Sequence, residues 1–166
     1  MAEHDKAQIC ENGHIISMSR SSFTMDKFCS KCGAKILDAC PKCNAPFKGE
    51  PKDMQAAYLV KIKPSAYCYE CGSMYPWTES KIKAVEEKIK LEMELTDLQQ
   101  RELIAVLPEL VCETSKTEAA VAKVKRIAMF IQTNAAAALI KEIISVCCPV
   151  ATAALQAFGE TFISRG

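Results

Sequence analysis

The pattern of hydrophobic and polar positions divides the chain into two regions. Up to about residue 78, the apolar residues come in short runs separated by Gly, Pro, Asn and Asp, which are typical of turns. From residue 79 onward they recur every three or four positions, as on one face of an α-helix. The pattern therefore predicts a β-rich module over residues 1–78 and an α-helical region over residues 79–166.

The first region is expected to consist of short strands joined by turns. Asn12-Gly13 is typical of a hairpin turn, because Gly13 can adopt positive φ at no steric cost. Residues 48–57 contain Gly, Pro and Asp and are expected to form a loop. The strands expected here are residues 7–10, 14–18, 34–37 and 58–62.

About four helices are expected in the second region. Thr78 is a suitable N-cap for the first, with Trp77 packing against Ile82 as a hydrophobic staple. The apolar positions of this helix are Ile82, Val85, Ile89 and Met93. The helices are expected from Glu79 to Glu94, from Thr96 to about Leu107, from Ser115 to at least Ile131, and from Val150 to about Ile163.

Local signals predict where these helices start and where they are interrupted. Thr96–Gln99 and Ser115–Glu118 match the capping box, in which two side chains satisfy backbone N–H groups of the first turn. Pro108 is expected to end the second helix or to begin a short extension. Residues 134–138 either continue the third helix or mark a bend. The apolar face of the third helix carries Val121, Val124, Ile127, Ala128 and Ile131.

Ten cysteines are the main chemical feature of the composition. Seven of them, together with one histidine, have the spacing of metal-binding knuckles, in which two nearby ligands bind one side of a metal ion. These eight residues are Cys10, His14, Cys29, Cys32, Cys40, Cys43, Cys68 and Cys71. Eight soft ligands are enough for two tetrahedral sites, so the sequence predicts two structural Zn²⁺ ions.

Two groupings of these ligands are open at this point. The sequential grouping places Cys10, His14, Cys29 and Cys32 on the first zinc and Cys40, Cys43, Cys68 and Cys71 on the second. The interleaved grouping joins the second ligand pair to the third and the first pair to the last. The sequential grouping is favoured, because the segment within each site is long enough to fold back as a hairpin, although spacing alone does not fix connectivity. Four protein ligands leave no open position for a catalytic water.

Charge and the N-terminal sequence bear on the compartment and on the partners. The formal net charge is +1, whereas nucleic-acid-binding domains usually carry a strong positive excess. Residues 1–6 contain no apolar segment typical of a secretory signal. Closely spaced cysteines in the reducing cytosol are more often metal ligands than disulfides. A cytoplasmic, reduced protein is therefore expected.

The sequence does not predict an enzyme. With His14 on zinc, His4 is the one histidine left to act as a base for a serine or cysteine nucleophile. A redox-active Cys-x-x-Cys would need a βαβ setting, which the pattern does not predict. The six glycines are isolated, unlike those of phosphate-binding loops.

Four aromatic residues flank the last knuckle and have two interpretations. Tyr67, Tyr69, Tyr75 and Trp77 can form a stacking platform for nucleic-acid bases, or they can cover a core built around zinc. The second interpretation is favoured, because Trp77 has the position of a helix staple. The lysines of this region are interspersed with acidic residues, which is typical of a solvated face.

An uncharged stretch, residues 143–158, leaves two interpretations of the longer segment 134–163. A bilayer span needs roughly 20 apolar residues, and the segment reaches that length only if Lys141 and Glu142 are buried in lipid. A core or subunit-packing role is favoured, and membrane insertion is the alternative. The cysteines outside the ligand set are expected to be buried thiols: Cys112, Cys147 and Cys148.

Several runs in the first region form a specific set of motifs. They are Ala7–His14, Phe28–Ala34, Cys40–Asn44 and Cys68–Thr78. Together they resemble a bacterial family known as domain of unknown function 2321. The resemblance covers about the first eighty residues well and the helical region more loosely. It implies a bacterial cytosolic protein with zinc-ribbon-like ligands at the eight positions named above, and it implies no activity.

The combined prediction is an α+β protein, with a two-zinc ribbon module followed by an α-helical region. The expected function is that of a non-enzymatic adaptor. Its zinc module recognises a protein partner, and its helices self-associate into a homo-oligomer or dock a partner. The alternatives are nucleic-acid binding through the zinc module and a membrane-acting effector that uses residues 134–163.

Overall fold

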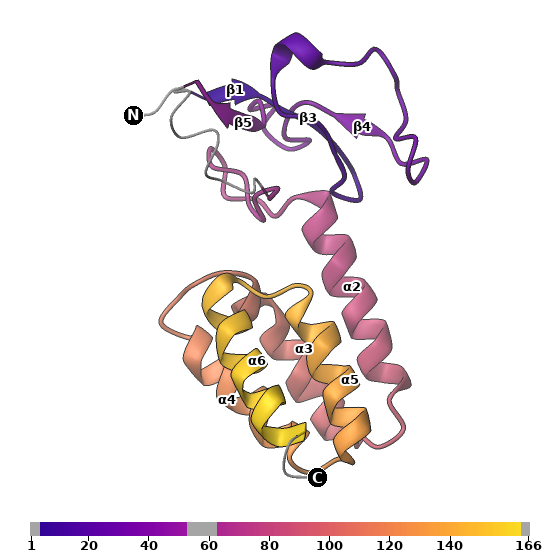
Figure 1. Cartoon of the computed structure of the whole chain (residues 1–166), viewed down its shortest axis with the longest axis vertical. Helices are drawn as coiled ribbons and strands as arrows, with labels where there is room; N and C mark the ends of the chain where they lie inside the picture. The colour runs from indigo at the N-terminus through magenta and orange to yellow at the C-terminus, as the bar shows by residue number, and fades with distance from the viewer. Residues whose placement is uncertain (1–3, 53–62, 164–166) are drawn as a thin grey trace. The chain divides into compact units, whose positions relative to one another are not determined.

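The computed structural model describes residues 4–52 and 63–163, so the strand predicted at residues 58–62 lies outside the described residues. The chain divides into two compact units, Met1–Ser80 and Lys81–Gly166, and the division falls inside helix α2 (Pro76–Leu91). The first unit carries the strands and the second carries the remaining helices (Figure 1). The fold class is α+β, as predicted.

Short strands form two small antiparallel sheets in the first unit. They are β1 (His4–Lys6), β2 (Gln8–Cys10), β3 (Ile15–Ser17), β4 (Ile36–Leu37) and β5 (Lys48–Pro51), with a 3-10 turn, η1, at Arg20–Ser22. β2 lies between β3 and β4, and β1 pairs with β5. The prediction of a loop over residues 48–57 is therefore wrong for its first four residues. β5 is held on one side by β1 and on the other by the Glu50 N–H, which donates to the Met18 carbonyl at 2.9 Å.

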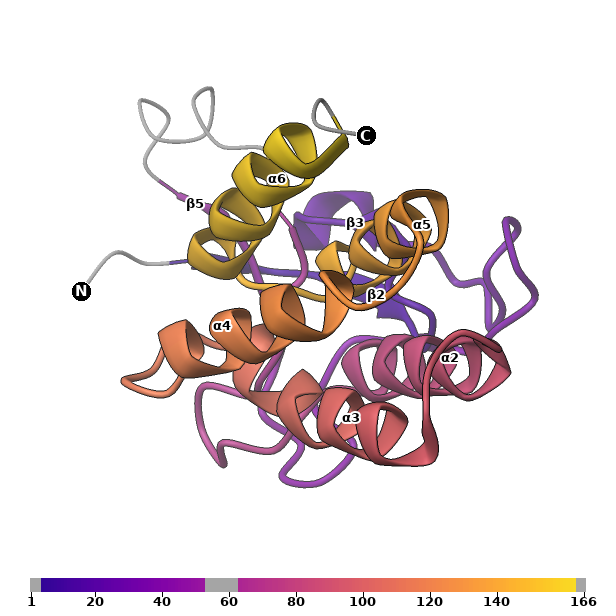
Figure 2. The same cartoon turned by 90° about the horizontal axis from the view of Figure 1, so that it is seen from below.

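The described residues contain five α-helices, one more than expected. After α2 come α3 (Asp97–Val111), α4 (Thr117–Ala128), α5 (Thr133–Ile144) and α6 (Pro149–Ile163). The additional helix is α5. Residues 129–132 are not helical, so α4 ends before them and α5 begins after them as a separate helix. α3 packs against α4, α5 packs against α6, and α4 contacts both α5 and α6 (Figure 2).

The predicted helix starts are right for α3 and wrong for α2. At α3 the capping box forms, since the Thr96 hydroxyl accepts from the Gln99 N–H at 3.3 Å and the Gln99 side chain accepts from the Thr96 N–H at 2.9 Å. α2 begins at Pro76, before the predicted N-cap Thr78, and proline is well suited to a first helical turn. Trp77 consequently lies inside the helix and not in the position of a staple.

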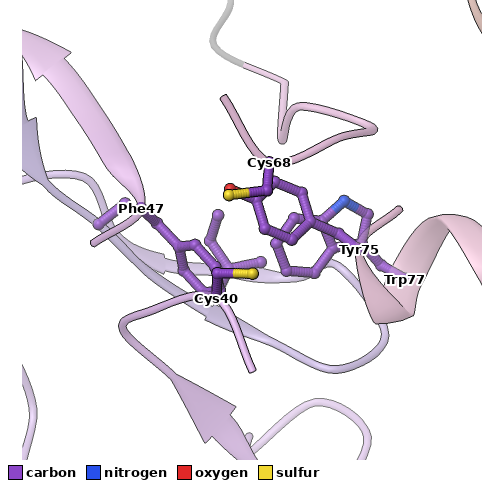
Figure 3. Close-up of a cluster of buried hydrophobic side chains, with 7 residues drawn as sticks. Cys40, Phe47, Cys68, Tyr75 and Trp77 are labelled. Atoms are coloured by element: carbon purple, nitrogen blue, oxygen red, sulfur yellow. The ribbon is translucent and has the colours of Figure 1, made fainter. Parts of the chain in front are cut away.

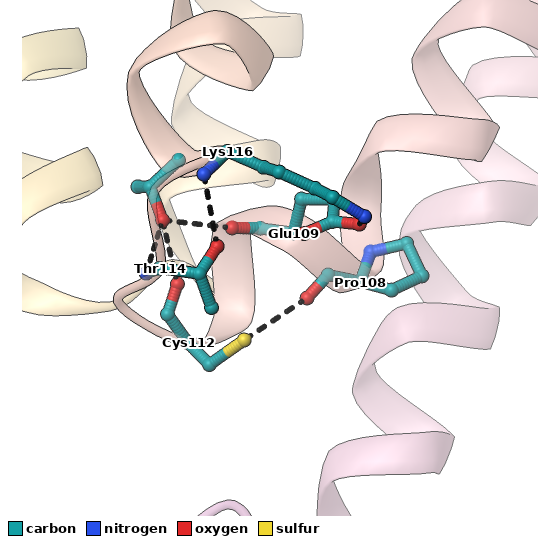
Figure 4. Close-up of polar contacts among 6 residues, drawn as sticks. Pro108, Glu109, Cys112, Thr114 and Lys116 are labelled. Carbon is teal, nitrogen blue, oxygen red and sulfur yellow. Dashed lines mark hydrogen bonds and ion pairs between the residues drawn. The ribbon is translucent and has the colours of Figure 1, made fainter.

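A threonine organises the connection between α3 and α4 in place of the capping box predicted at Ser115. The hydroxyl of Thr117 accepts from the Thr114 N–H at 2.9 Å and lies 2.9 Å from the Cys112 carbonyl oxygen, to which it can donate (Figure 4). Pro108 does not end α3, which continues to Val111. This connection is therefore held by side-chain contacts to the end of the preceding helix.

The second unit has an apolar core of its own. Its largest fully buried side chains are Ile89, Leu103, Leu107, Leu110, Val124, Ile143 and Leu155. The apolar face predicted for α4 is buried throughout. Met93, predicted on the apolar face of α2, lies beyond the end of that helix and is 95% exposed.

The uncharged C-terminal segment forms two helices joined by residues 145–148, not one continuous helix. Leu139, Ile140 and Ile143 of α5 are buried, as are Ala151 and Leu155 of α6. This burial agrees with the favoured packing interpretation. Among the residues that the structure describes, no helix has both the length and the apolar character needed to cross a membrane.

Two leucines of α3 provide a matched test of this core. Leu103→Ala should lower the free energy of unfolding by about 2–5 kcal/mol, because Leu103 is fully buried and its truncation leaves a cavity. Leu98→Ala on the same helix should change it by less than about 0.5 kcal/mol, because Leu98 is 67% exposed. Urea unfolding followed by helical circular dichroism measures both, and equal losses would contradict the assigned core.

Candidate metal centres

Three Cys-x-x-Cys segments in the first unit share one backbone structure. In each, the N–H of the first cysteine donates to the carbonyl five residues later at 2.8 Å, as Cys29 does to Ala34, Cys40 to Ala45 and Cys68 to Ser73. A single antiparallel bridge then closes each segment: Phe28 with Lys35, Ala39 with Pro46, and Tyr67 with Met74. The repeated hydrogen bonds turn both sulfurs of a segment toward the same side.

A residue with positive φ follows each of these cysteine pairs. The residues are Gly33 (φ 70°), Asn44 (φ 60°) and Gly72 (φ 67°). The N–H of each donates to the carbonyl of the first cysteine, at 2.8 to 2.9 Å. Glycine adopts this conformation freely and asparagine tolerates it better than most residues, so the sequence suits the turn at all three positions.

The first cluster joins a hairpin to a knuckle. The hairpin between β2 and β3 supplies Cys10 and His14, and the knuckle before β4 supplies Cys29 and Cys32. The Nδ1 atom of His14 faces the sulfurs, at 3.5 Å from Cys10, 3.8 Å from Cys29 and 3.2 Å from Cys32. The sulfurs of Cys10 and Cys32 are 3.7 Å apart.

The second cluster joins the two remaining knuckles. Its sulfurs come from Cys40, Cys43, Cys68 and Cys71. Two contacts cross between the knuckles, at 3.9 Å for Cys40 with Cys71 and at 3.6 Å for Cys43 with Cys68. In each cluster all four donor atoms lie within 4.8 Å of one another, so each can hold a metal ion. The structure thus has the sequential grouping.

The cysteines of the second cluster differ widely in pKa, partly because their sulfurs lie close together. Burial raises the pKa of Cys68, but hydrogen bonds from the Cys71 and Glu70 N–H groups outweigh it and lower the pKa to about 6. For Cys43 a hydrogen bond from the Ala45 N–H lowers the pKa, but burial and the three neighbouring sulfurs outweigh it and raise the pKa to about 12. Neighbouring thiols therefore oppose a full set of thiolates, and a bound cation would reverse this effect.

The cysteines of the first cluster also have pKa values shifted in opposite directions. A hydrogen bond from the Ala34 N–H is the main cause that lowers the pKa of Cys32, to about 6. Burial raises the pKa of Cys10. Each cluster thus combines a thiol that ionises readily with one that ionises with difficulty.

An aromatic cluster lies beside the second group of cysteines (Figure 3). Tyr75 and Trp77 are 4.5 Å apart between ring centroids, and Phe47 meets them edge-on at 5.1 and 5.3 Å. All three are at most 3% exposed, together with Cys40 and Cys68 of the metal-ligand set. Tyr75 and Trp77 therefore form core, as the favoured interpretation predicts for them, and they do not present open faces to nucleic-acid bases. Tyr69 does not follow that interpretation, because it is 48% exposed.

Gly13 connects the first cluster to this aromatic core. A Cβ atom at Gly13, whose φ is +82°, would lie 2.9 Å from Cβ of Trp77. The hairpin between Cys10 and His14 can approach the tryptophan only because residue 13 has no side chain. Sequence reasoning identified the turn but missed this contact and the role of Phe47, since both depend on residues distant in the chain.

A comparison with protein families bears on the whole arrangement. The family model described as "Uncharacterized protein conserved in bacteria (DUF2321)" matches residues 3–155. The chain belongs to this family. The DUF2321 match includes all eight residues of the two clusters and extends through α5 into α6. Searches among curated proteins and among solved structures gave no match to this DUF2321 chain.

Two glycine substitutions separate backbone strain from the Trp77 contact. Gly33→Ala should cost about 1–2 kcal/mol, because its φ is positive but a Cβ there would contact nothing within 4 Å. Gly13→Ala should cost clearly more, because it adds the clash with Trp77. Urea unfolding followed by the fluorescence of Trp77 measures both changes. Equal losses would show that the packing of Gly13 against Trp77 does not contribute.

Proposed function

We propose that each cluster holds one structural Zn²⁺ ion, and that the protein is a non-enzymatic binding protein, an adaptor. In this proposal the first unit recognises a protein partner and the second unit self-associates. The proposal places the protein in the cytoplasm, where a reducing environment keeps cysteines available as metal ligands.

The spacing of the donor atoms carries the zinc assignment. In a tetrahedral site with Zn–S bonds of about 2.3 Å, two sulfurs are about 3.8 Å apart, and a sulfur and a nitrogen are about 3.6 Å apart. The sulfur pairs given above range from 3.6 to 3.9 Å, and the three His14 nitrogen–sulfur distances average close to the tetrahedral value. These distances therefore fit the edges of a zinc-sized tetrahedron, and the donor atoms of each cluster all lie within 4.8 Å of one another.

The composition of the donor sets supports zinc and a structural role. Thiolate and imidazole ligands favour zinc over harder ions such as magnesium or calcium. Each set supplies four protein ligands, which is the number in closed, structural sites, whereas catalytic zinc usually has three and a water. The ions would then contribute to folding and not to chemistry.

Exposed apolar side chains support self-association of the second unit. The loop after α2 and the loop after α4 are joined by the Gln132 N–H, which donates to the Glu94 carboxylate at 2.7 Å. Met93, Met129 and Phe130 belong to these loops and are at least 64% exposed. Large apolar residues gathered on adjoining loops are typical of an interaction surface.

Removing one ligand should remove one zinc ion. Purified protein should contain two zinc ions per chain by elemental analysis, and Cys43→Ser should contain one, because three ligands are left in the second cluster. Cys112→Ser should keep both ions, because Cys112 belongs to neither cluster. One zinc or none in the unaltered protein, or two in Cys43→Ser, would contradict the assignment.

Self-association can be tested with two matched double variants. The unaltered protein should have the mass of a dimer or larger assembly by light scattering, and Met129→Ser with Phe130→Ser should shift it toward the monomer. Met25→Ser with Phe28→Ser removes the same two residue types from exposed positions of the first unit and should leave the mass unchanged. A monomeric unaltered protein would remove self-association from the proposal.

A further inference from the structure

A cavity of about 270 Å³ opens in the first unit, and its lining includes none of the eight residues of the two candidate metal-binding clusters. Its wall includes Phe47, Tyr75 and Trp77, the aromatic core drawn in Figure 3, together with Ile9 and Met18. This wall is apolar and held in place by the ring contacts described above. A cavity of this size takes one large side chain or a small fragment, because drug-sized ligands fill about 300–1,000 Å³.

The titratable groups around this cavity are basic or phenolic. Lys48, Lys63 and His4 line it, and no Asp or Glu among the described residues does so. The Lys48 ammonium lies over the ring of Tyr69, 4.1 Å from its centroid, and His4 Nδ1 is 3.2 Å from the Gly49 carbonyl oxygen. The cavity therefore combines an apolar wall with cationic groups.

We propose that this cavity binds an acidic peptide segment of a partner protein through one bulky apolar side chain. The apolar side chain would pack against the half-buried Met18, Pro64 and Tyr67, which line the cavity beside the buried rings of the core. Flanking carboxylates would pair with Lys48 and Lys63. An aromatic or large aliphatic anchor in a pocket, surrounded by complementary charges, is a common arrangement in protein recognition. The inference rests on the adaptor role proposed above and gives the chemistry of its partner.

The arrangement of the rings favours a peptide over a nucleic-acid base. Stacking of a base needs an open ring face. The rings of Phe47, Tyr75 and Trp77 are buried against one another, and Lys48 covers a face of Tyr69. An apolar side chain needs no open ring face and can pack against the half-buried apolar residues of the lining.

Trp77 makes binding directly measurable, because it is the single tryptophan of the chain and lies in the cavity wall. The probe is a capped pentapeptide with a central phenylalanine flanked on each side by two glutamates, titrated into the zinc-loaded full chain. The expected result is a saturable change in tryptophan fluorescence with one peptide per chain. The same peptide with alanine at the centre should bind at least tenfold more weakly.

Two charge-reversal pairs separate this site from general attraction of an acidic peptide. Lys48→Glu with Lys63→Glu should weaken binding at least tenfold. Lys27→Glu with Lys35→Glu makes the same change in net charge at a different cavity of the first unit and should change the affinity by less than about twofold. Zinc content and mass are measured on every sample, so that a misfolded variant is recognised.

Several outcomes would overturn the inference. These are no saturable change with the phenylalanine peptide, equal affinity for the alanine peptide, or equal weakening by the two lysine pairs. If decathymidine displaces the peptide and binds more tightly than it does, the ligand of this cavity is a nucleic acid and not an acidic peptide. If the protein holds two zinc ions but binds no peptide, only this inference fails, whereas absence of zinc from the unaltered protein contradicts the proposed function itself.

Discussion

The convergence of four soft donor atoms in each cluster is the constraint on which the first unit depends. Its strands are two to four residues long, so their ladders contribute few hydrogen bonds. Among the residues that the structure describes, the buried apolar cluster of this unit has seven members, and two of these, Cys40 and Cys68, are themselves metal-ligand candidates. Ordering loops of this length costs about 1–2 kcal/mol of backbone entropy per residue. Metal binding is the interaction that can offset this cost where so little apolar surface is buried.

The two clusters are linked by a continuous series of contacts. Gly13, inside the first cluster's hairpin, packs against Trp77, and Trp77 packs against Tyr75. The Tyr75 hydroxyl is hydrogen bonded to Cys68 of the second cluster, and burial together with this bond raises the pKa of Tyr75. A disturbance at either cluster would therefore reach the aromatic core between them. The wall of the proposed peptide site belongs to that core, so its shape depends on both clusters.

Features encoded within a few residues could be predicted from the sequence. The knuckle turns follow from cysteine spacing and from Gly33 and Gly72, and the buried face of α4 follows from its period. Features that depend on distant partners could not. β5 forms because β1, more than forty residues earlier, pairs with it. α4 starts at Thr117 because that hydroxyl finds partners at the end of α3, which outweighs the local capping signal at Ser115.

The two proposed surfaces belong to different units of the chain and reinforce each other if both are used. A cavity that accepts one side chain and a few carboxylates would bind a single peptide weakly, because small contact areas rarely offset the entropy of association. A chain that self-associates through its second unit would carry one such cavity per copy. Linked sites of this kind can raise overall affinity by about 10²–10⁴ without any new contact, provided that the partner presents more than one acidic segment. Self-association of the helical unit would then determine how many cavities can bind the partner at the same time. A partner with a repeated acidic motif would bind more tightly than one with a single motif.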